Sequence, residues 1–366
     1  MGHLKQIKLV QISASLNPML GGPAKVVEDT SNIFVNYFDA SLIVFGHVMH
    51  SNQKSITVPT ILNNRYGWTW RTPQKSIRKK IIEADILLIH GFYLYSTILA
   101  IFLSKSKKIY IMPHGSLEDY QEQRGRLRKI IFRIVLRTIG KNSLFHFIVG
   151  SHTEMESVRK VFPNAKVSVV GLGVRNSDSK LYEESKLHNP IKLYCISRIV
   201  HKKRIDLSIK TLQKLNLSGP IFELSIIGNG DNFLELELKK LVSELGLGNQ
   251  VKFHGFLEGS KKQKVIEECD IFLLNSENEN FAIAVAEAIV LGKPVVVSSY
   301  VAMHDFVDKY SVGETASDLT VDAISKSILN VVNNYDKMRN NCVQYAPLLY
   351  WNNVIMNWIE IISEDF

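Results

Sequence analysis

The sequence predicts an α/β protein with two doubly wound domains, each built on a parallel sheet. Short runs rich in Val, Ile and Leu alternate with helical stretches along the whole chain, and a polar segment over residues 175–190 interrupts this alternation. Runs that are apolar on both faces are typical of parallel strands that helices cover on both sides. Two arrays of strands and helices in succession therefore predict two Rossmann-like sheets.

The expected elements follow from these runs. In the first half we expect strands over residues 7–14, 41–46, 86–90, 108–113 and 147–150, with helices that include 24–38 and 126–139. In the second half we expect strands over 191–196, 222–227, 251–255, 271–274 and 295–297, and helices over 205–215, 233–245, 260–268 and 281–291. Ligands of open α/β sheets bind beyond the carboxyl ends of the strands, so two facing domains predict one interdomain cleft.

The domain boundaries depend on the polar segment, which ends in Asn-Pro and has little apolar periodicity. We expect a first domain over residues 1–175, a linker over 176–190 and a second domain over 191–347. The remaining stretch, 348–366, predicts a helix that carries two tryptophans.

Composition excludes several classes of protein. The chain has 366 residues, of which 46% are hydrophobic and 22% charged, and this is ordinary for a folded protein. Three widely spaced cysteines form no zinc-ligand pattern and favour a reducing compartment. No run is long and apolar enough to span a membrane, and no signal peptide precedes the first strand, so we expect a cytoplasmic protein.

The charge is unevenly distributed between the halves. Residues 1–187 carry a net charge of +13, whereas residues 188–366 carry −4. Much of the positive charge belongs to one segment: Arg124, Arg126, Arg128, Lys129, Arg133, Arg137 and Lys141. Helical periodicity places its aliphatic residues on one stripe: Leu127, Ile130, Ile131, Ile134 and Val135.

This basic segment has two interpretations. In one, the aliphatic stripe packs on the core and the cations are solvated. In the other, the segment contacts anionic lipid or attracts an anionic substrate. We expect no nucleic acid as partner, because the sequence has no RNA-recognition signature, no zinc finger and no basic stripe with stacking aromatics.

The strongest candidate site lies around residues 275–298. A buried strand ends near residue 274, and a polar loop leads into an apolar helix whose free N–H groups favour an anion. Glu279 precedes this helix and Glu287 lies within its apolar run, where a carboxylate needs a partner. Eight helical residues span about 12 Å, so the two carboxylates would reach opposite ends of one ligand. The alternative is a dipole partner at Glu279 and a surface charge at Glu287.

Other strand ends carry weaker signals. Arg198 and Lys203 follow an expected strand, where cations suit a phosphate, although a solvated basic turn has the same pattern. Gly228-Asn-Gly230 fits a nucleotide turn or an ordinary tight turn. In the first half, Gly21 and Gly22 precede Pro23 and would allow close approach of a ligand. His90 and His114 each precede a glycine after successive strands, so at least one is expected to face the cleft.

Together these motifs resemble the family-4 group of retaining glycosyltransferases, which have the GT-B fold. The resemblance covers most of the chain, in order and spacing. Its most specific element is the Glu-x7-Glu pattern of Glu279 and Glu287, followed by Gly292-Lys-Pro294. Arg198 and Lys203 match the Arg-x4-Lys pair of the family. The family pattern also includes Gly228, His254-Gly255-Phe256, Gly21-Gly22 and Pro113-His114-Gly115.

The resemblance implies roles for these residues. Arg198 and Lys203 would hold the donor diphosphate, and Glu287 would accept hydrogen bonds from the ribose. Glu279, Asn280 and the N–H groups near Phe281 and Ala282 would surround the transferred sugar. His114 would contact the donor sugar or phosphate, and Gly22 would let the first domain approach the phosphates. The helix over 348–366 would cross back to the first domain, although packing on its own domain is an alternative.

The chain departs from the family at three positions. Ser197 stands where a glycine usually precedes the arginine, and Arg204 stands where a glycine usually follows the lysine. The usual Gly-Phe-Gly is Asn280-Phe281-Ala282. This last change alters the expected shape of the sugar pocket.

The resemblance implies a nucleotide-sugar donor, such as a UDP- or GDP-sugar, with no cofactor and no metal. Fixed cations and a helix N-terminus can stabilise the departing diphosphate without a metal ion. The acceptor would be a saccharide or a polyprenyl-diphosphate-linked saccharide in bacterial surface polysaccharide or lipopolysaccharide synthesis, near an anionic membrane surface. A nucleotide-sugar epimerase of GT-B fold and an inactive GT-B binding protein are the alternatives.

Overall fold

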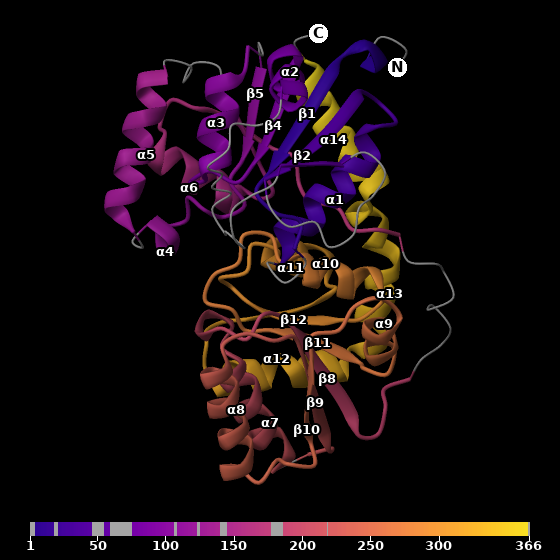
Figure 1. The fold of residues 1–366 in the computed structure, drawn as a ribbon. Coiled ribbons are helices and arrows are strands. Elements are labelled where there is room, and N and C mark those ends of the chain that lie inside the picture. The colour runs from indigo at the N-terminus through magenta and orange to yellow at the C-terminus, as the bar shows by residue number, and fades with distance from the viewer. Residues whose placement is uncertain are drawn as a thin grey trace. The chain divides into compact units, whose positions relative to one another are not determined.

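The computed structural model describes residues 4–17, 21–45, 55–58, 75–105, 108–122, 125–139, 145–176, 186–217 and 219–364. The chain divides into two compact units (Figure 1). Unit 1 comprises Met1–Gly171 together with Ile355–Phe366, and unit 2 comprises Leu172–Val354. Much of the linker expected over 176–190 falls on residues 177–185, which lie outside the described residues.

Unit 1 is built on a parallel sheet of seven strands in the order β3-β2-β1-β4-β5-β6-β7. Every described residue of β4 and β6 is buried, as expected for strands covered by helices on both faces. The strands are β1 (Lys8–Ser13), β2 (Asp39–Phe45), β3 (Ser55–Val58), β4 (Ile86–His90), β5 (Lys108–Met112), β6 (Phe145–Val149) and β7 (Lys166–Val169).

Helices flank this sheet, and the last helix of the chain is one of them. Trp358 is fully buried, its ring centroid lies 6.1 Å from that of Phe34, and its indole N–H donates to the Gly171 carbonyl over 3.0 Å. The helices are η1 (Leu4–Gln6), α1 (Gly22–Phe34), α2 (Lys75–Glu83), α3 (Tyr95–Leu103), α4 (Asp119–Glu122), α5 (Arg126–Ile139), α6 (His152–Val161) and α14 (Trp351–Ser363).

Unit 2 repeats the scheme with a parallel sheet of six strands, in the order β10-β9-β8-β11-β12-β13. Its strands are β8 (Ile191–Ile196), β9 (Phe222–Ile227), β10 (Val251–Gly255), β11 (Ile271–Leu274), β12 (Val295–Ser298) and β13 (Gly313–Ala316). Its helices are η5 (His201–Lys203), α7 (Ile205–Asn216), α8 (Asn232–Glu244), α9 (Gly259–Glu267), α10 (Ile283–Val290), α11 (His304–Tyr310), α12 (Val321–Asn333), α13 (Tyr335–Tyr345) and η6 (Ala346–Leu349).

The strand order places one switch point in each unit. The chain first builds the sheet outward in one direction and then returns to build it in the other, so the order reverses between β1 and β4 and between β8 and β11. The loops that leave two such neighbouring strands diverge to opposite faces, and ligands of this fold class bind in the opening between them. The two predicted doubly wound sheets are therefore confirmed, and each defines a place to look for a site.

Helix α5 corrects one expectation about its aliphatic stripe. Four of its aliphatic residues point to solvent: Leu127 (71% exposed), Ile130 (40%), Ile131 (52%) and Ile134 (53%). The buried residues of α5 are Phe132 and Leu136. On the inner side, the Lys129 ammonium lies 4.7 Å from the centre of the Tyr93 ring. The interpretation in which the stripe packs on the core was therefore wrong.

In the described part of the chain, the helices are too short or too polar to cross a bilayer.

Candidate functional site

Two loops meet at the switch point of unit 2. One leaves β8 and runs from Ser197 into η5, and the other leaves β11 and runs to the start of α10. The backbone N–H of Glu277 donates to the Lys202 carbonyl over 2.8 Å, and the Ser276 hydroxyl donates to the same oxygen over 3.1 Å. These two hydrogen bonds to the Lys202 carbonyl hold the loops together without any ion pair.

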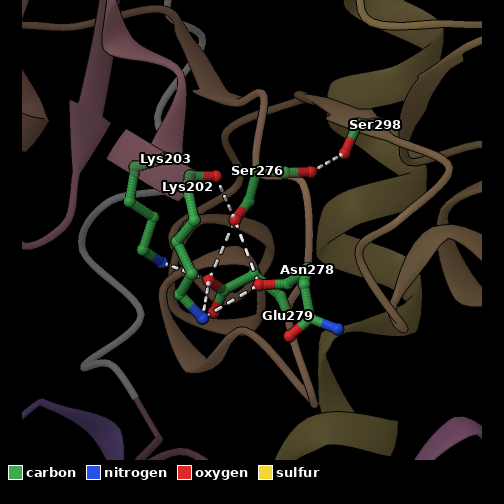
Figure 2. A network of polar contacts seen from close by, with 6 residues as sticks. All are labelled: Lys202, Lys203, Ser276, Asn278, Glu279 and Ser298. Atoms are coloured by element: carbon green, nitrogen blue, oxygen red, sulfur yellow. Dashed lines mark hydrogen bonds and ion pairs between the residues drawn. The ribbon is translucent and has the colours of Figure 1, made fainter. Parts of the chain in front are cut away.

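A cluster of charged side chains lies on these loops (Figure 2). The Glu279 carboxylate, through Oε1, contacts Lys203 Nζ at 2.6 Å, Lys202 Nζ at 3.4 Å and Ser276 Oγ at 3.0 Å. The Lys202 ammonium also donates to the Asn278 carbonyl over 3.0 Å. From β12, the Ser298 hydroxyl donates to the Ser276 carbonyl. We call Lys202, Lys203, Ser276 and Glu279 the lysine–glutamate cluster.

Burial decides the electrostatics of this cluster. The side chains of Lys203 and Glu279 are only 11% and 14% exposed. Burial lowers the pKa of Lys203, and the Glu279 carboxylate offsets this only in part. Burial would raise the pKa of Glu279, but the two neighbouring ammonium groups outweigh it and the pKa is lowered. With Glu279 ionised and both lysines protonated the cluster keeps one net positive charge, so it can still attract an anion.

Arg198 lies on the same β8 loop with its side chain exposed. The structure records no hydrogen bond or ion pair for this guanidinium within the described residues, and its charge contributes to the lowered pKa of Lys203. The loop is held from behind, because Ile199 N donates to the Asn229 carbonyl over 2.9 Å. Arg198 is therefore presented on a fixed backbone.

The Gly228-Asn-Gly230 motif has a structural explanation. A Cβ at Gly228 would overlap the carbonyl oxygen of Ser197, and one at Gly230 would overlap that of Ile199. Both glycines let the β8 loop lie directly on the loop that follows β9. The motif thus positions Arg198.

Two departures from the family pattern fall on unusual backbone. Arg204 (φ 46°) and Ala282 (φ 64°) both lie in the left-handed region, where glycine is favoured. The chain thus keeps a glycine-like backbone without the glycine. At the first position the Arg204 side chain pairs with Asp206 at 3.0 Å and Glu277 at 3.1 Å. At the second, Ala282 is the N-cap residue of α10 and makes no side-chain capping hydrogen bond.

Glu287 lies in α10 and has the partner that its burial requires. Its carboxylate contacts Lys262 Nζ of α9 at 2.9 Å, and its side chain is 15% exposed. The estimate of about 12 Å between Glu279 and Glu287 assumed a continuous helix. That assumption does not hold, because α10 begins only at Ile283 and Glu279 lies in the loop before it.

Asn280 and Phe281 lie in the loop before α10, where Phe281 packs against the core. Phe256 follows β10 and is 41% exposed. The carbonyl of Gly255, its neighbour, accepts a hydrogen bond from Gly228 N over 2.7 Å. The predicted residues around β8, β9, β10 and β11 therefore lie on loops at the same edge of the sheet, the edge where parallel strands end.

The switch point of unit 1 carries a chain of neutral polar groups. Gln11 lies in β1, His90 ends β4 and His114 follows β5. His90 Nε2 lies 3.0 Å from Gln11 Oε1, and His90 Nδ1 lies 3.0 Å from His114 Nε2. Burial lowers the pKa of His90 well below its usual range and lowers that of His114 to about 4.

The backbone around His114 is held firmly. His114 has a φ of 52°, which is rare for a residue with a side chain. The carboxylate of buried Glu154 accepts from Gly115 N over 2.7 Å and from Gly150 N over 2.9 Å. Glu154 thus joins the loops after β5 and β6.

Gly21 precedes α1, which begins at Gly22 with Pro23 in its first turn, as predicted. Gly21 has a φ of 90°. Of the preceding loop, residues 18–20 lie outside the described residues.

Four residues of these sites have no clear functional signal in the sequence. Lys202 stands in a run of cations, so the sequence does not distinguish it from its neighbours. Ser276 has no signal beyond its place after a strand. Gln11 looked like one polar residue in an apolar strand, and Lys262 stands in a lysine pair on a surface helix. Within the described ranges, no three His, Cys, Asp or Glu side chains gather as metal ligands.

The sequence is similar to those of known glycosyltransferases. Residues 176–348 match the family model for glycosyl transferases group 1. The amylovoran biosynthesis glycosyltransferase AmsK of Erwinia amylovora is 25% identical over 69% of this chain and 62% of its own length. GDP-mannose:cellobiosyl-diphosphopolyprenol alpha-mannosyltransferase of Xanthomonas campestris is 22% identical, over 97% of this chain and 96% of its own length.

Solved structures share the fold. HepE from Anabaena, in complex with UDP and glucose, superposes with a TM-score of 0.75, covering 98% of this chain and 99% of that one at 17% identity. WaaG, a glycosyltransferase involved in lipopolysaccharide biosynthesis, gives a TM-score of 0.70 over 97% of this chain and 99% of that one at 12% identity. With the two doubly wound sheets, these matches show that the chain has the GT-B fold and that its residues 176–348 are similar to the glycosyl transferases group 1 family.

Proposed function

We propose that this chain transfers a sugar from a nucleoside diphosphate sugar to a saccharide acceptor. The observation that carries the proposal is the lysine–glutamate cluster at the switch point of unit 2, beside the exposed Arg198. A pyrophosphate needs fixed cations, whereas a sugar needs an acceptor for its hydroxyls. The cluster supplies both kinds of group within a few ångströms.

The chemistry follows from where charge develops. As the bond between the sugar and the diphosphate breaks, the leaving diphosphate gains negative charge. Arg198 and Lys203 would stabilise this charge, because preorganised cations cost no reorganisation during the reaction. The uncapped N-terminus of α10 adds partial positive charge near Phe281 and Ala282. We therefore propose transfer that requires no metal and no cofactor.

The remaining predicted residues would orient the donor. Glu279 and Asn280 would hold the transferred sugar, and Glu287 would accept hydrogen bonds from the ribose hydroxyls. Gly228 and Phe256 lie at the strand ends expected to border the nucleotide. In unit 1, we propose that His114 contacts the donor and that Gly21 and Gly22 allow close approach to its phosphates.

We further propose that the configuration of the anomeric carbon is retained. The carboxylate best placed in unit 2, Glu279, is held in ion pairs with two lysines, which makes it a poor nucleophile. This supports displacement from the same face, in which the leaving phosphate helps to deprotonate the acceptor. Proton NMR of the first-formed product tests this proposal, and an inverted anomeric centre would contradict it.

The diphosphate role has a direct test. We expect Arg198→Ala and Lys203→Ala to lower turnover at least a hundredfold while the protein still folds, since losing one such electrostatic contact typically costs about 10²–10³ in rate. Lys214→Ala is a matched control, because Lys214 is an exposed lysine of α7 that pairs with Asp322 outside the cluster. Near-normal turnover in either cluster variant would refute the role.

For the acceptor, we propose a saccharide carried on a lipid diphosphate in bacterial surface polysaccharide synthesis. The relative in Xanthomonas campestris is named for a diphosphopolyprenol acceptor, and its alignment covers nearly all of both chains. The net charge of +13 over residues 1–187 also suits an anionic acceptor. The first measurement is a panel of UDP- and GDP-sugars in a thermal-shift assay, because a bound donor stabilises the fold.

We also propose that α5 lies on an anionic membrane surface at the cytoplasmic side. Its four exposed aliphatic residues follow the i, i+3, i+4, i+7 spacing of one helical face. The exposed residues Arg126, Arg128 and Arg137 flank this face. Inward, Arg133 Nη1 lies 3.3 Å from Glu122, so α5 is anchored to unit 1 by its other side. An aliphatic stripe between arginines is the pattern of a helix that lies in the interface of a bilayer.

Vesicle sedimentation tests this contact. We expect the protein to bind vesicles with phosphatidylglycerol and not vesicles of phosphatidylcholine alone. Replacing the three arginines by glutamine should weaken binding about a hundredfold, at roughly 1 kcal/mol for each charge near the surface. Ile131→Ser with Ile134→Ser should also weaken it, whereas Phe233→Ser with Leu236→Ser on exposed α8 should not. Equal binding by all variants would refute the contact.

A nucleotide-sugar epimerase remains the alternative. It would convert the donor without an acceptor, so an assay with donor alone separates the two reactions.

A further inference from the structure

The neutral chain in unit 1 fixes where protons lie. Gln11 is fully buried in β1, and its Oε1 lies 3.0 Å from His90 Nε2 and 3.1 Å from the Thr30 hydroxyl. A carbonyl oxygen only accepts hydrogen bonds, so the proton of this contact belongs to His90 Nε2. A neutral His90 then has no proton on Nδ1.

The second contact transmits this constraint to His114. His90 Nδ1 lies 3.0 Å from His114 Nε2. Because His90 Nδ1 can only accept, the proton between the rings belongs to His114 Nε2. Neutral His114 therefore has a bare Nδ1, which is a hydrogen-bond acceptor.

Both rings are neutral near pH 7. His90 is 3% exposed, and burial is the largest cause of the lowered pKa in both rings. The rings lie 5.3 Å apart between centroids, so a charge on one would also disfavour a charge on the other.

The backbone adds a second constraint on His114. Its left-handed φ is a strained conformation for a residue with a side chain, and Glu154 holds the following glycine in place. Strain of this kind persists only where the surroundings over-determine the position. Both the orientation and the tautomer of the ring are therefore fixed before any ligand binds.

We infer that Gln11 and His90 are positioning residues that make His114 a hydrogen-bond acceptor for a sugar hydroxyl, and not a donor to phosphate. Phosphate oxygens offer only lone pairs, so they would repel a bare Nδ1, whereas a hydroxyl can donate to it. The choice of sugar as partner rests on the proposed function. The assignment of the protons rests on these contacts and on the neutrality of both rings.

The proton assignment is tested on the wild-type protein without ligand. Long-range ¹H–¹⁵N spectra of ¹⁵N-histidine-labelled protein at pH 7.5 distinguish the two tautomers, and His90→Asn and His114→Asn identify the signals. We expect Nε2–H in both rings. Nδ1–H in either ring would overturn the inference, because it would require the Gln11 amide to turn its nitrogen toward His90.

The role toward the sugar is tested by binding. Calorimetry with UDP, GDP, UDP-glucose and GDP-mannose compares the wild type with Gln11→Met, which loses the acceptor. We expect Gln11→Met to weaken nucleotide-sugar binding roughly three- to tenfold, the worth of one hydrogen bond, and to leave nucleoside diphosphate binding within about twofold.

His146→Gln is the control, because His146 is a buried histidine of β6 that contacts Ser168, outside this chain of contacts. Equal losses for the nucleoside diphosphate and the nucleotide sugar in Gln11→Met would overturn the role toward the sugar. If the wild type binds none of the four probes, the proposed function fails, and the tautomers measured by NMR still decide the proton assignment.

Discussion

Replacing the two ends of the Lys203–Glu279 ion pair should have unequal effects on stability. We compare Glu279→Gln with Lys203→Met, each close in size to the residue that it replaces. Removing one partner of a buried ion pair typically costs about 3–5 kcal/mol, because the other charge is left uncompensated. Both side chains are more than four-fifths buried, so this range applies here.

The surroundings make the two losses different. In Lys203→Met, the Glu279 carboxylate keeps Lys202 at 3.4 Å and the Ser276 hydroxyl at 3.0 Å. In Glu279→Gln, two ammonium groups remain with no carboxylate between them. We therefore expect a loss of about 3–5 kcal/mol for Glu279→Gln and about half of that for Lys203→Met.

Urea unfolding followed by circular dichroism measures both losses, and the double variant gives their coupling. The difference between wild type and Glu279→Gln should also shrink in acid. The pKa of Glu279 is lowered in the folded state, so its contribution is present above the usual value of 4.5 and is lost as pH falls through the lowered pKa. A larger loss for Lys203→Met than for Glu279→Gln would refute this reasoning.

Three further predictions concern unfolding. Ala282→Gly should stabilise the protein by about 1 kcal/mol, because glycine relieves the left-handed backbone, and a lower melting temperature would contradict this. Gly228→Ala should lower the free energy of unfolding measured in urea by several kcal/mol, because the added Cβ would overlap the Ser197 carbonyl oxygen. An unchanged urea midpoint would refute the close approach of these two loops. Wild-type stability should fall from pH 6.5 to about 4, by on the order of 3 kcal/mol for His114 alone, and His114→Asn should remove that part.

The sequence was sufficient for the fold and for the edge of each sheet where the candidate sites lie. The strand β8 was expected over 191–196 and β11 over 271–274, as found. Polar residues directly after such strands must lie at the carboxyl edge of the sheet. Arg198, Lys203 and Glu279 were therefore placed correctly at that edge, while their roles toward a donor remain proposals.

The sequence could not predict which side chains from different strands and helices contact each other. The contact of Gln11 with His90 joins residues 79 positions apart, and that of Lys262 with Glu287 joins different helices. Periodicity groups residues on one face of a helix but does not say which face meets the core. On the inner side of α5, the Lys129 ammonium contacts the Glu122 carboxylate and the Tyr93 ring. The aliphatic stripe of the helix therefore faces outward.

The two switch points occupy equivalent positions in their sheets but differ in electrostatic character. In unit 2 the loops after β8 and β11 bring together two ammonium groups and a carboxylate. In unit 1 the ends of β4 and β5 bring together two imidazoles that burial keeps neutral, beside an amide of β1. A charged cluster suits a diphosphate, whereas a neutral chain with a fixed acceptor suits uncharged hydroxyls. The donor proposed above carries both kinds of group, so we expect its binding to depend on the neutrality of His114 as much as on the charge of Lys203.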